Sequence, residues 1–598
     1  MPEASSSIEN TGPTQPTESP RLYKFFLERS EELVASYSDI GRKARTLCAR
    51  TALAEALSLA RARLRSGGVT RPSADPADAG HGIATLPDVV TEALELLSAD
   101  QVLKRTQPEV VAELRSLVEP LTAAEYECTE IALSKVEGLL SHLRTTYISD
   151  ALDTVRALVT NGQKDLLDVE AIAETLISDL RARGFSDQTL GGHISAAGAK
   201  PSWEEGIESL RVVWTAKEKK LRVFVAVTQG LENDLPSDGS LVRVDELPAS
   251  GGKPPPASGP FLAFEISGVD PVTAASIARS RIEAILGAAA VFVPGAADLR
   301  SSVVLVKDGD GLVGVDTNPI LNKEKRGSTP GQVRRVIQSA WRSTREPDGD
   351  PLFDAIRHQQ RALHTPDPES RFMLLWLGIE RLVLGSRDFS KLLSAVRRLV
   401  PASIAMAKLR RDIGAFVAAL EHFGPPQEQT KQLLGFETGG TWHINRERVL
   451  EAMLSSEEDS RKITSLFYSS PLLTQWYFRI RRALHSETKG LGAAVAEYVD
   501  ASRRRTEWHI LRLYRTRNSV AHASLGPAWI FDLISHAHYY LTQLVAICVH
   551  HREREPYKAP VDILTNRAAH YETWIKLVES NYARALTVRA LLRPTALF

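Results

Sequence analysis

The sequence predicts a mainly α-helical protein with three folded parts, and three observations support this. Apolar residues recur every three or four positions from about Leu22 to Leu180, which is the spacing of helices that bury one face. Short β-branched runs follow, and such runs are typical of strands. Helical periodicity then returns and continues to the C-terminus. We expect an N-terminal helical region (21–200), a small central α+β domain (201–342), a C-terminal helical bundle (350–555) and a helical extension (556–598).

Size and composition agree with a folded, multidomain protein. The chain has 598 residues, more than one hydrophobic core usually supports, and its 43% hydrophobic and 24% charged residues are usual for a soluble globular protein. Residues 1–20 lack an apolar core, so we expect a disordered tail and not a secretory signal. No apolar run reaches the roughly 20 residues that a membrane span needs. Three widely separated cysteines offer no disulfide framework, which fits the reducing cytoplasm.

The central part is defined by its strand-like runs. Asp308-Gly309-Asp310-Gly311 supplies the glycines of a hairpin turn, and Asp270-Pro271 predicts the start of a helix that reaches about Leu286. Segments rich in Gly and Pro predict loops at Ser66–Leu86 and Leu247–Pro260. We expect strands at Ser209–Thr215, Leu221–Thr228, Phe261–Ile266, Ser302–Lys307 and Leu312–Val315.

Charge is balanced overall but divided unevenly along the chain. Residues 371–598 carry 32 Lys and Arg against 21 Asp and Glu, whereas residues 1–370 carry 41 against 52. This asymmetry indicates that the basic part meets an anion such as nucleic acid, and that the acidic part meets the basic part. The alternative is that both are ordinary solvated surfaces.

One motif in the basic part has the residues that RNA cleavage requires: Arg517-Asn518-Ser519-Val520-Ala521-His522. Cleavage without a metal needs a base for the ribose 2′-hydroxyl, an acid for the leaving 5′-oxygen and positive charge on the phosphate. Histidine titrates near neutral pH, and the permanently charged fork of arginine matches two phosphate oxygens.

The geometry of a helix limits how this motif can act. On an ideal helix positions 517 and 522 are roughly 140° apart and do not share a face. Pro527 follows closely and disfavours helical geometry just before it. We therefore expect a helix from about Ser502 to end near His522, so that the imidazole turns toward Arg517 while Asn518 hydrogen-bonds to the histidine or the substrate.

Further basic residues accompany the motif on the same helix and the preceding one. They predict phosphate contacts whose strength falls with salt. Trp476, Tyr477, Trp508 and Tyr514 are interleaved with them, either as stacking platforms for bases or, as is common at helical spacing, as core residues. The residues that we expect to contact RNA are Arg505, Arg512, Arg515, Arg482 and His485.

Three segments together give a resemblance to a known family. Residues 371–382 (RFMLLWLGIERL), the Arg-rich helix ending in Arg517–His522 and the apolar helix Ile530–Val549 resemble the Apea-like branch of the HEPN superfamily over roughly 350–550. The resemblance implies a helical bundle that dimerises so that two motifs form one composite site. It also implies a metal-independent endoribonuclease without cofactors, of the kind found in toxin–antitoxin and antiphage systems. Arg517 would then bind phosphate, His522 would transfer protons and Asn518 would orient them.

Other interpretations remain open. Glu380 is either a buried partner of a basic site residue or part of a salt bridge without function. His509 is a further RNA contact or a structural residue. The other four histidines of this region are either a set of metal ligands or a helix face with an exposed end: His536, His538, His550 and His551. No cysteine or carboxylate joins them at a ligand spacing, which favours the second alternative. The main rival function is a noncatalytic HEPN-type module that binds RNA or protein. A third possibility is that the acidic half masks the basic half until a phage-derived trigger binds.

Overall fold

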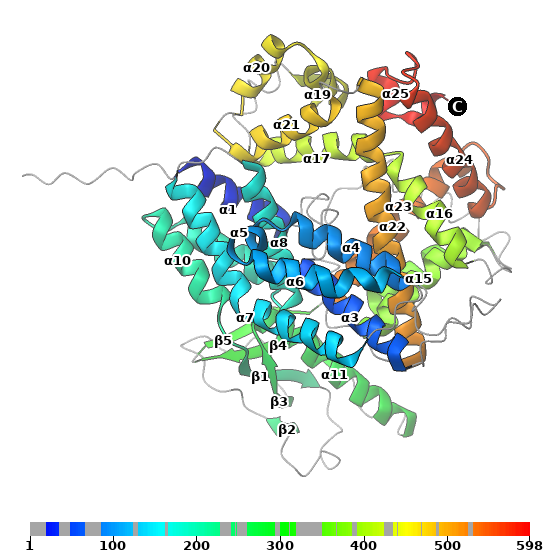
Figure 1. The fold of residues 1–598 in the computed structure, drawn as a ribbon. Helices are drawn as coiled ribbons and strands as arrows, with labels where there is room; N and C mark the ends of the chain where they lie inside the picture. Colours follow the sequence, from blue (N-terminus) through cyan, green and yellow to red (C-terminus); the bar gives the residue numbers. More distant parts are fainter. Residues whose placement is uncertain are drawn as a thin grey trace, which may run out of the picture.

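The computed structural model describes most of the chain as a helical assembly with a five-stranded sheet and a two-stranded hairpin (Figure 1). The predicted tail and both predicted loops lie almost wholly outside the described residues. In the described part, no helix is both long and apolar enough to cross a membrane. The described residues are 20–34, 48–65, 85–123, 129–161, 166–227, 241–244, 247, 260–292, 299–309, 311–317, 350–365, 367–384, 392–423, 428, 434–438, 441–467, 469–485, 490–523 and 530–597.

The N-terminal helices form one packed group because each buries an apolar stripe. Helix α1 packs on α8 and α9, and α3 packs on α4 and α7. Polar residues cap several of them; Asp100, for example, ends α4 and accepts hydrogen bonds from the first backbone amides of α5. The group comprises α1 (Arg21–Val34), α3 (Ala49–Arg65), α4 (Leu86–Ala99), α5 (Gln101–Thr106), α6 (Pro108–Val118), η2 (Glu119–Thr122), α7 (Glu130–Thr160), α8 (Leu166–Ala182), α9 (Asp187–Gly198) and α10 (Trp203–Trp214).

Helix α10 corrects one prediction. Ser209–Thr215 was expected to be a strand, but its residues up to Trp214 belong to α10, which packs on α9 and α7. Ile207, Leu210 and Trp214 are buried at helical spacing. The β-branched pair within the run is therefore less decisive than this three- and four-residue periodicity.

The central sheet is antiparallel, with strand order β2-β3-β1-β4-β5. The other four predicted strands are confirmed, whereas β2 was not predicted. Helix α11 covers one face; Asp270 caps it by accepting from the amide of Thr273 at 2.7 Å and also accepts from the amide of Ser186, which ties the sheet to the N-terminal helices. The elements are β1 (Lys219–Val227), β2 (Leu241–Val244), β3 (Phe261–Gly268), α11 (Pro271–Phe292), β4 (Leu299–Asp308) and β5 (Gly311–Asp316).

The C-terminal part is a helical bundle built around one long helix, α22. Helix α16 packs on α22 and α24, while α15 lies between α14 and α23. A small hairpin, β6–β7, was not predicted. The elements are α14 (Pro351–His364), α15 (Pro368–Leu384), α16 (Leu392–Ala405), α17 (Lys408–Phe423), β6 (Gly435–Thr438), β7 (Thr441–Ile444), α19 (Arg446–Leu454), α20 (Glu457–Ser465), α21 (Pro471–Leu484), α22 (Leu491–Ala523), α23 (Ile530–Arg552), α24 (Pro560–Glu579), α25 (Val588–Leu592) and η4 (Pro594–Leu597).

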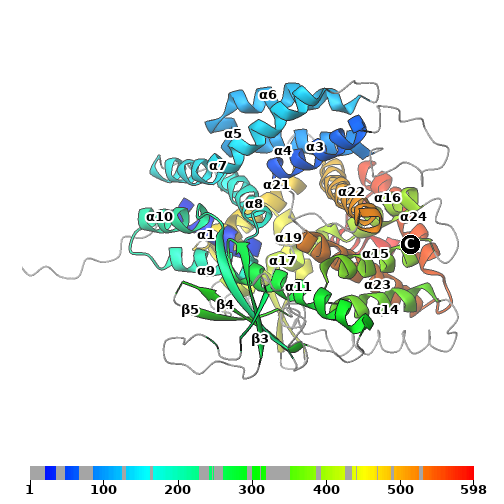
Figure 2. The ribbon, with the colours of Figure 1, turned by 90° about the horizontal axis from the view of Figure 1, so that it is seen from below.

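The N-terminal and C-terminal helices pack directly against each other. Figure 2 shows α3–α6 as a layer on one side of the molecule with α22 beside it, and α22 contacts α4. Helix α1 packs on α21, where Glu28 accepts from the hydroxyl of Ser470 and the amide of Leu472, both at 3.0 Å. A carboxylate of the acidic half thus satisfies the N-terminus of a helix in the basic half.

Candidate active site

The predicted motif lies in the last turns of α22. This helix begins at Leu491, eleven residues before the predicted start, and ends at Ala523, directly after His522. The expected helix end near the histidine is therefore confirmed. The side chain of His522 lies outside the described residues, so its approach to Arg517 stays a prediction.

Arg517 is held by a carboxylate from a neighbouring helix. Its Nε lies 3.3 Å from Oε1 of Glu380 on α15, and its Nη1 donates to Oδ1 of Asn518 at 3.1 Å. Trp376 donates from Nε1 to the same Glu380 oxygen at 2.6 Å. Glu380 is thus a buried partner of Arg517, as both interpretations of this residue allow.

The burial of this pair is unequal, and this matters for its chemistry. Only 3% of the Glu380 side chain is exposed, against 27% for Arg517. Burial raises the pKa of Glu380 above its ordinary value, and the charge of Arg517 acts in the opposite direction. The carboxylate therefore fixes one side of the guanidinium, while part of the arginine stays accessible to a phosphate.

Arg512 and Arg515, which were predicted to contact RNA, are both buried against the N-terminal helices. Arg512 donates from Nη2 to Glu92 on α4 at 2.6 Å and from Nε to Glu55 on α3 at 3.0 Å. Arg515 donates from Nε to Glu55 at 2.8 Å. With side-chain exposures of 2% and 6%, neither arginine is available to RNA in this conformation.

The pKa of Glu55 reflects its contacts with the two arginines. Burial acts to raise the pKa of Glu55, but Arg515 and Arg512 together overcome it and hold this pKa below its ordinary value. The acidic half therefore meets the basic half through buried ion pairs, as one interpretation of the charge asymmetry predicted.

The remaining predicted contacts are dispersed. Arg482 and His485 are exposed at the C-terminal end of α21, where a ring nitrogen of His485 lies 3.1 Å from the carbonyl oxygen of Met453. Arg505 is exposed and faces a cavity further along α22. Trp476 and Tyr477 are fully buried, so the core alternative is correct for these two aromatics.

Comparisons with models of known families, with curated proteins and with solved structures found no match to this chain. The family resemblance consequently rests on the residues of the chain alone.

His509 and His536 are buried in the C-terminal bundle. His509 and His536 stack with ring centroids 4.7 Å apart, and Nδ1 of His509 lies 2.7 Å from the hydroxyl of Tyr540. Burial, with the charges of Arg512 and Arg505, lowers the pKa of His509 to about 3, so the ring is neutral at physiological pH. Among the described residues no group of three or more His, Cys, Asp or Glu is placed to hold a metal ion.

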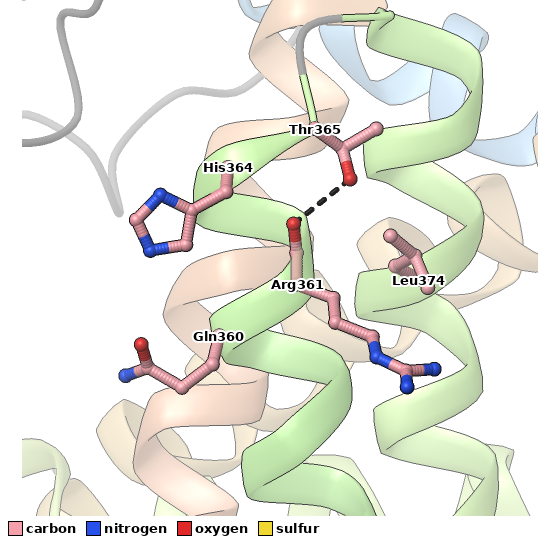
Figure 3. A pocket seen from close by; sticks show the side chains of 5 residues that line it. All are labelled: Gln360, Arg361, His364, Thr365 and Leu374. Carbon is pink, nitrogen blue, oxygen red and sulfur yellow. Dashed lines mark hydrogen bonds between the residues drawn. The ribbon is translucent and has the colours of Figure 1, made fainter. Parts of the chain in front are cut away.

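The residues that line a shallow hollow between α14 and α15 do not form a cluster of charged side chains (Figure 3). Its lining contains a single arginine, Arg361, and no carboxylate, and Thr365 donates to the carbonyl of Arg361 at 2.8 Å. In Figure 3 His364 and Gln360 point away from Leu374 on the opposite helix. We assign no function to this hollow.

Sequence reasoning missed one cluster of charged residues at the junction of the two halves. Lys408, Arg411 and Asp412 begin α17 and face the same cavity as Arg505 and Tyr498 of α22. The signal was available locally, because Tyr498 and Arg505 are seven residues apart and so share a helix face. What brings α17 and α8 to that face is tertiary packing, which no local pattern records.

Proposed function

We propose that the chain is a metal-independent endoribonuclease that acts on cellular RNA in bacterial defence. In this proposal the ribose 2′-hydroxyl attacks the adjacent phosphate, the 5′-oxygen leaves, and the products carry a 2′,3′-cyclic phosphate and a 5′-hydroxyl. Arg517 binds the phosphate, His522 transfers protons, and Asn518 orients the arginine. A second copy of the chain, joined through the C-terminal bundle, supplies the matching motif.

The observation that carries this proposal is the setting of Arg517. Its guanidinium is fixed between Glu380 and Asn518 at the end of a long bundle helix, with 27% of its side chain exposed. A preorganised cation of this kind stabilises the charge that develops on a phosphate without first having to reorganise. His522 follows five residues later, at the end of the same helix, and its imidazole is the titratable group.

Regulation belongs to the same proposal. Arg512 and Arg515 precede Arg517 on the same helix and are covered by α3 and α4 through Glu55 and Glu92. We propose that this closed arrangement limits RNA binding and that a phage-derived trigger opens it. Opening would add arginines to the phosphate-binding surface and would make RNA affinity depend more steeply on salt.

The test is to express the full chain in a bacterium and to sequence RNA ends bearing 5′-hydroxyls or cyclic phosphates. Wild type should generate such ends. Arg517→Lys should reduce them about 100-fold, because lysine keeps a charge beside Glu380 but loses the two-point fork. His522→Gln should also reduce them about 100-fold. Arg504→Ala is the matched control, since Arg504 is exposed on the same helix and pairs only loosely with Asp500 at 3.5 Å. Equal RNA ends from wild type, Arg517→Lys and His522→Gln would refute the nuclease.

A noncatalytic module that binds RNA or protein is the second candidate, and one observation favours it. The contacts of Arg517 with Glu380 and Asn518 are also those of an arginine with a structural role. If this candidate is right, RNA or partner binding survives His522→Gln and no new RNA ends appear in any variant.

A further inference from the structure

A cavity of about 370 Å³ lies at the junction of the N-terminal and C-terminal halves, away from the motif. One wall comes from α8, and the others come from the end of α16 and from α17, α21, α22 and α23. The volume is in the lower part of the range for small-molecule pockets, roughly 300–1,000 Å³. It therefore suits a small ligand.

Each carboxylate that lines the cavity already has a partner. Glu170 pairs with Arg479, and both Glu170 and Glu174 pair with the fully buried Arg29. Asp412 lies 2.6 Å from Nζ of Lys408 and accepts from the hydroxyl of Tyr498. The acidic lining is thus neutralised by groups of the protein itself.

Two guanidinium groups are left over. Arg411 donates to the carbonyl of Ile404 but, among the described residues, makes no ion pair with a carboxylate. Arg505 has no hydrogen bond and no ion pair within the described part of the chain, although it lines the cavity. The nearby His509 is neutral and adds no charge. Among the described residues that line it, the cavity therefore has an excess of positive charge.

The charges of Arg505 and Arg411 also act on Lys408. Burial, together with the charges of Arg505 and Arg411, lowers its pKa to about 8, despite the opposing charge of Asp412. A dianion in the cavity would relieve this repulsion among cations. Tyr539 and Tyr540 add aromatic surface to the same lining, which suits the organic part of a ligand.

We propose that this cavity binds a small organic phosphate, with the phosphate contacted by Arg411 and Arg505 and the organic part packed on the tyrosines. The site goes beyond the nuclease proposal and does not depend on it. Because α8 belongs to the half that covers the basic face of α22, the ligand bridges the two halves and stabilises their contact.

Isothermal titration of the full chain with phenyl phosphate, inorganic phosphate and phenol tests the proposal. Phenyl phosphate should bind at least about tenfold more tightly than inorganic phosphate or phenol, and Arg505→Ala should weaken it at least about tenfold. Arg504→Ala, on the neighbouring exposed position, should leave binding within about twofold. Hydrogen exchange should show that phenyl phosphate protects amides of both α8 and α22.

Several results would overturn the proposal. No binding of phenyl phosphate at millimolar concentration would refute the site, as would equal loss in Arg504→Ala and Arg505→Ala. Equal affinity for phenyl phosphate and inorganic phosphate would refute the role of the tyrosines. If an RNA oligonucleotide binds only when Arg505 is present and phenyl phosphate does not displace it, Arg505 binds RNA and not a small phosphate.

Discussion

Replacing Glu92 with glutamine should loosen the junction between α4 and α22. In the folded protein Glu92 accepts from Arg512 at 2.6 Å, with side-chain exposures of 4% and 2%. Removing one partner of a buried ion pair costs about 3–5 kcal/mol, because it leaves a desolvated charge without compensation. Arg512 keeps Glu55 at 3.0 Å, so we expect a cost of about 3 kcal/mol, near the lower limit.

Amide hydrogen exchange provides the assay. A loss of about 3 kcal/mol in the local opening free energy corresponds to roughly 100-fold faster exchange of the α4 and α22 amides. Glu95→Gln is the control, because Glu95 is an exposed residue of the same helix. If the α4 and α22 amides exchange at the same rate in Glu92→Gln as in Glu95→Gln, the expected loss of stability at the junction would be refuted. The double variant Glu92→Leu with Arg512→Leu should recover part of the protection, since it buries no unpaired charge.

Two other expectations follow from buried positions. Burial raises the pKa of Asp100 to about 6 from an ordinary 3.8. The contribution of the protonated Asp100 carboxyl to stability is therefore complete below pH 3.8 and is lost as pH rises through 6, so Asp100→Asn should stabilise the protein by up to about 3 kcal/mol at pH 7.5 and not at pH 3.5. Equal denaturant midpoints of variant and wild type at both pH values would contradict this. At Gly492 an added Cβ would lie 2.0 Å from the carbonyl oxygen of Val578, so Gly492→Ala should cost about 1–3 kcal/mol of stability. At Gly138 nothing lies within 4 Å of an added Cβ, so Gly138→Ala should stabilise its helix by about 0.5–1 kcal/mol. Thermal unfolding that ranks the two glycine variants in the opposite order would contradict the packing argument.

The helical class and most strands could be predicted because periodicity and turn residues are local signals. Asp270-Pro271 predicted the start of α11 correctly, since a capping carboxylate and a proline act within one turn. Ser209–Thr215 was predicted wrongly because its β-branched pair outweighed an equally visible helical spacing. The short β2 and the β6–β7 hairpin were missed, since strands of four residues depend on their neighbours for stability.

The site could be predicted only in part, for a different reason. The basic character of α22 is plain in the sequence, but which of its arginines are accessible depends on Glu55 and Glu92, more than 400 positions away. Overall charge asymmetry suggested that the halves meet, without identifying the pairs. The sequence alone therefore did not reveal that Arg512 and Arg515 join the two halves of the fold.

The distance in sequence between the partners at this junction also has a consequence for protein synthesis. Glu92 and Arg512 are separated by 420 residues, which a ribosome translates in roughly 20–80 s. The acidic helices therefore leave the ribosome, and have time to fold, well before the arginines that they will cover exist. If the C-terminal motif is toxic, its restraint is already in place when it first emerges.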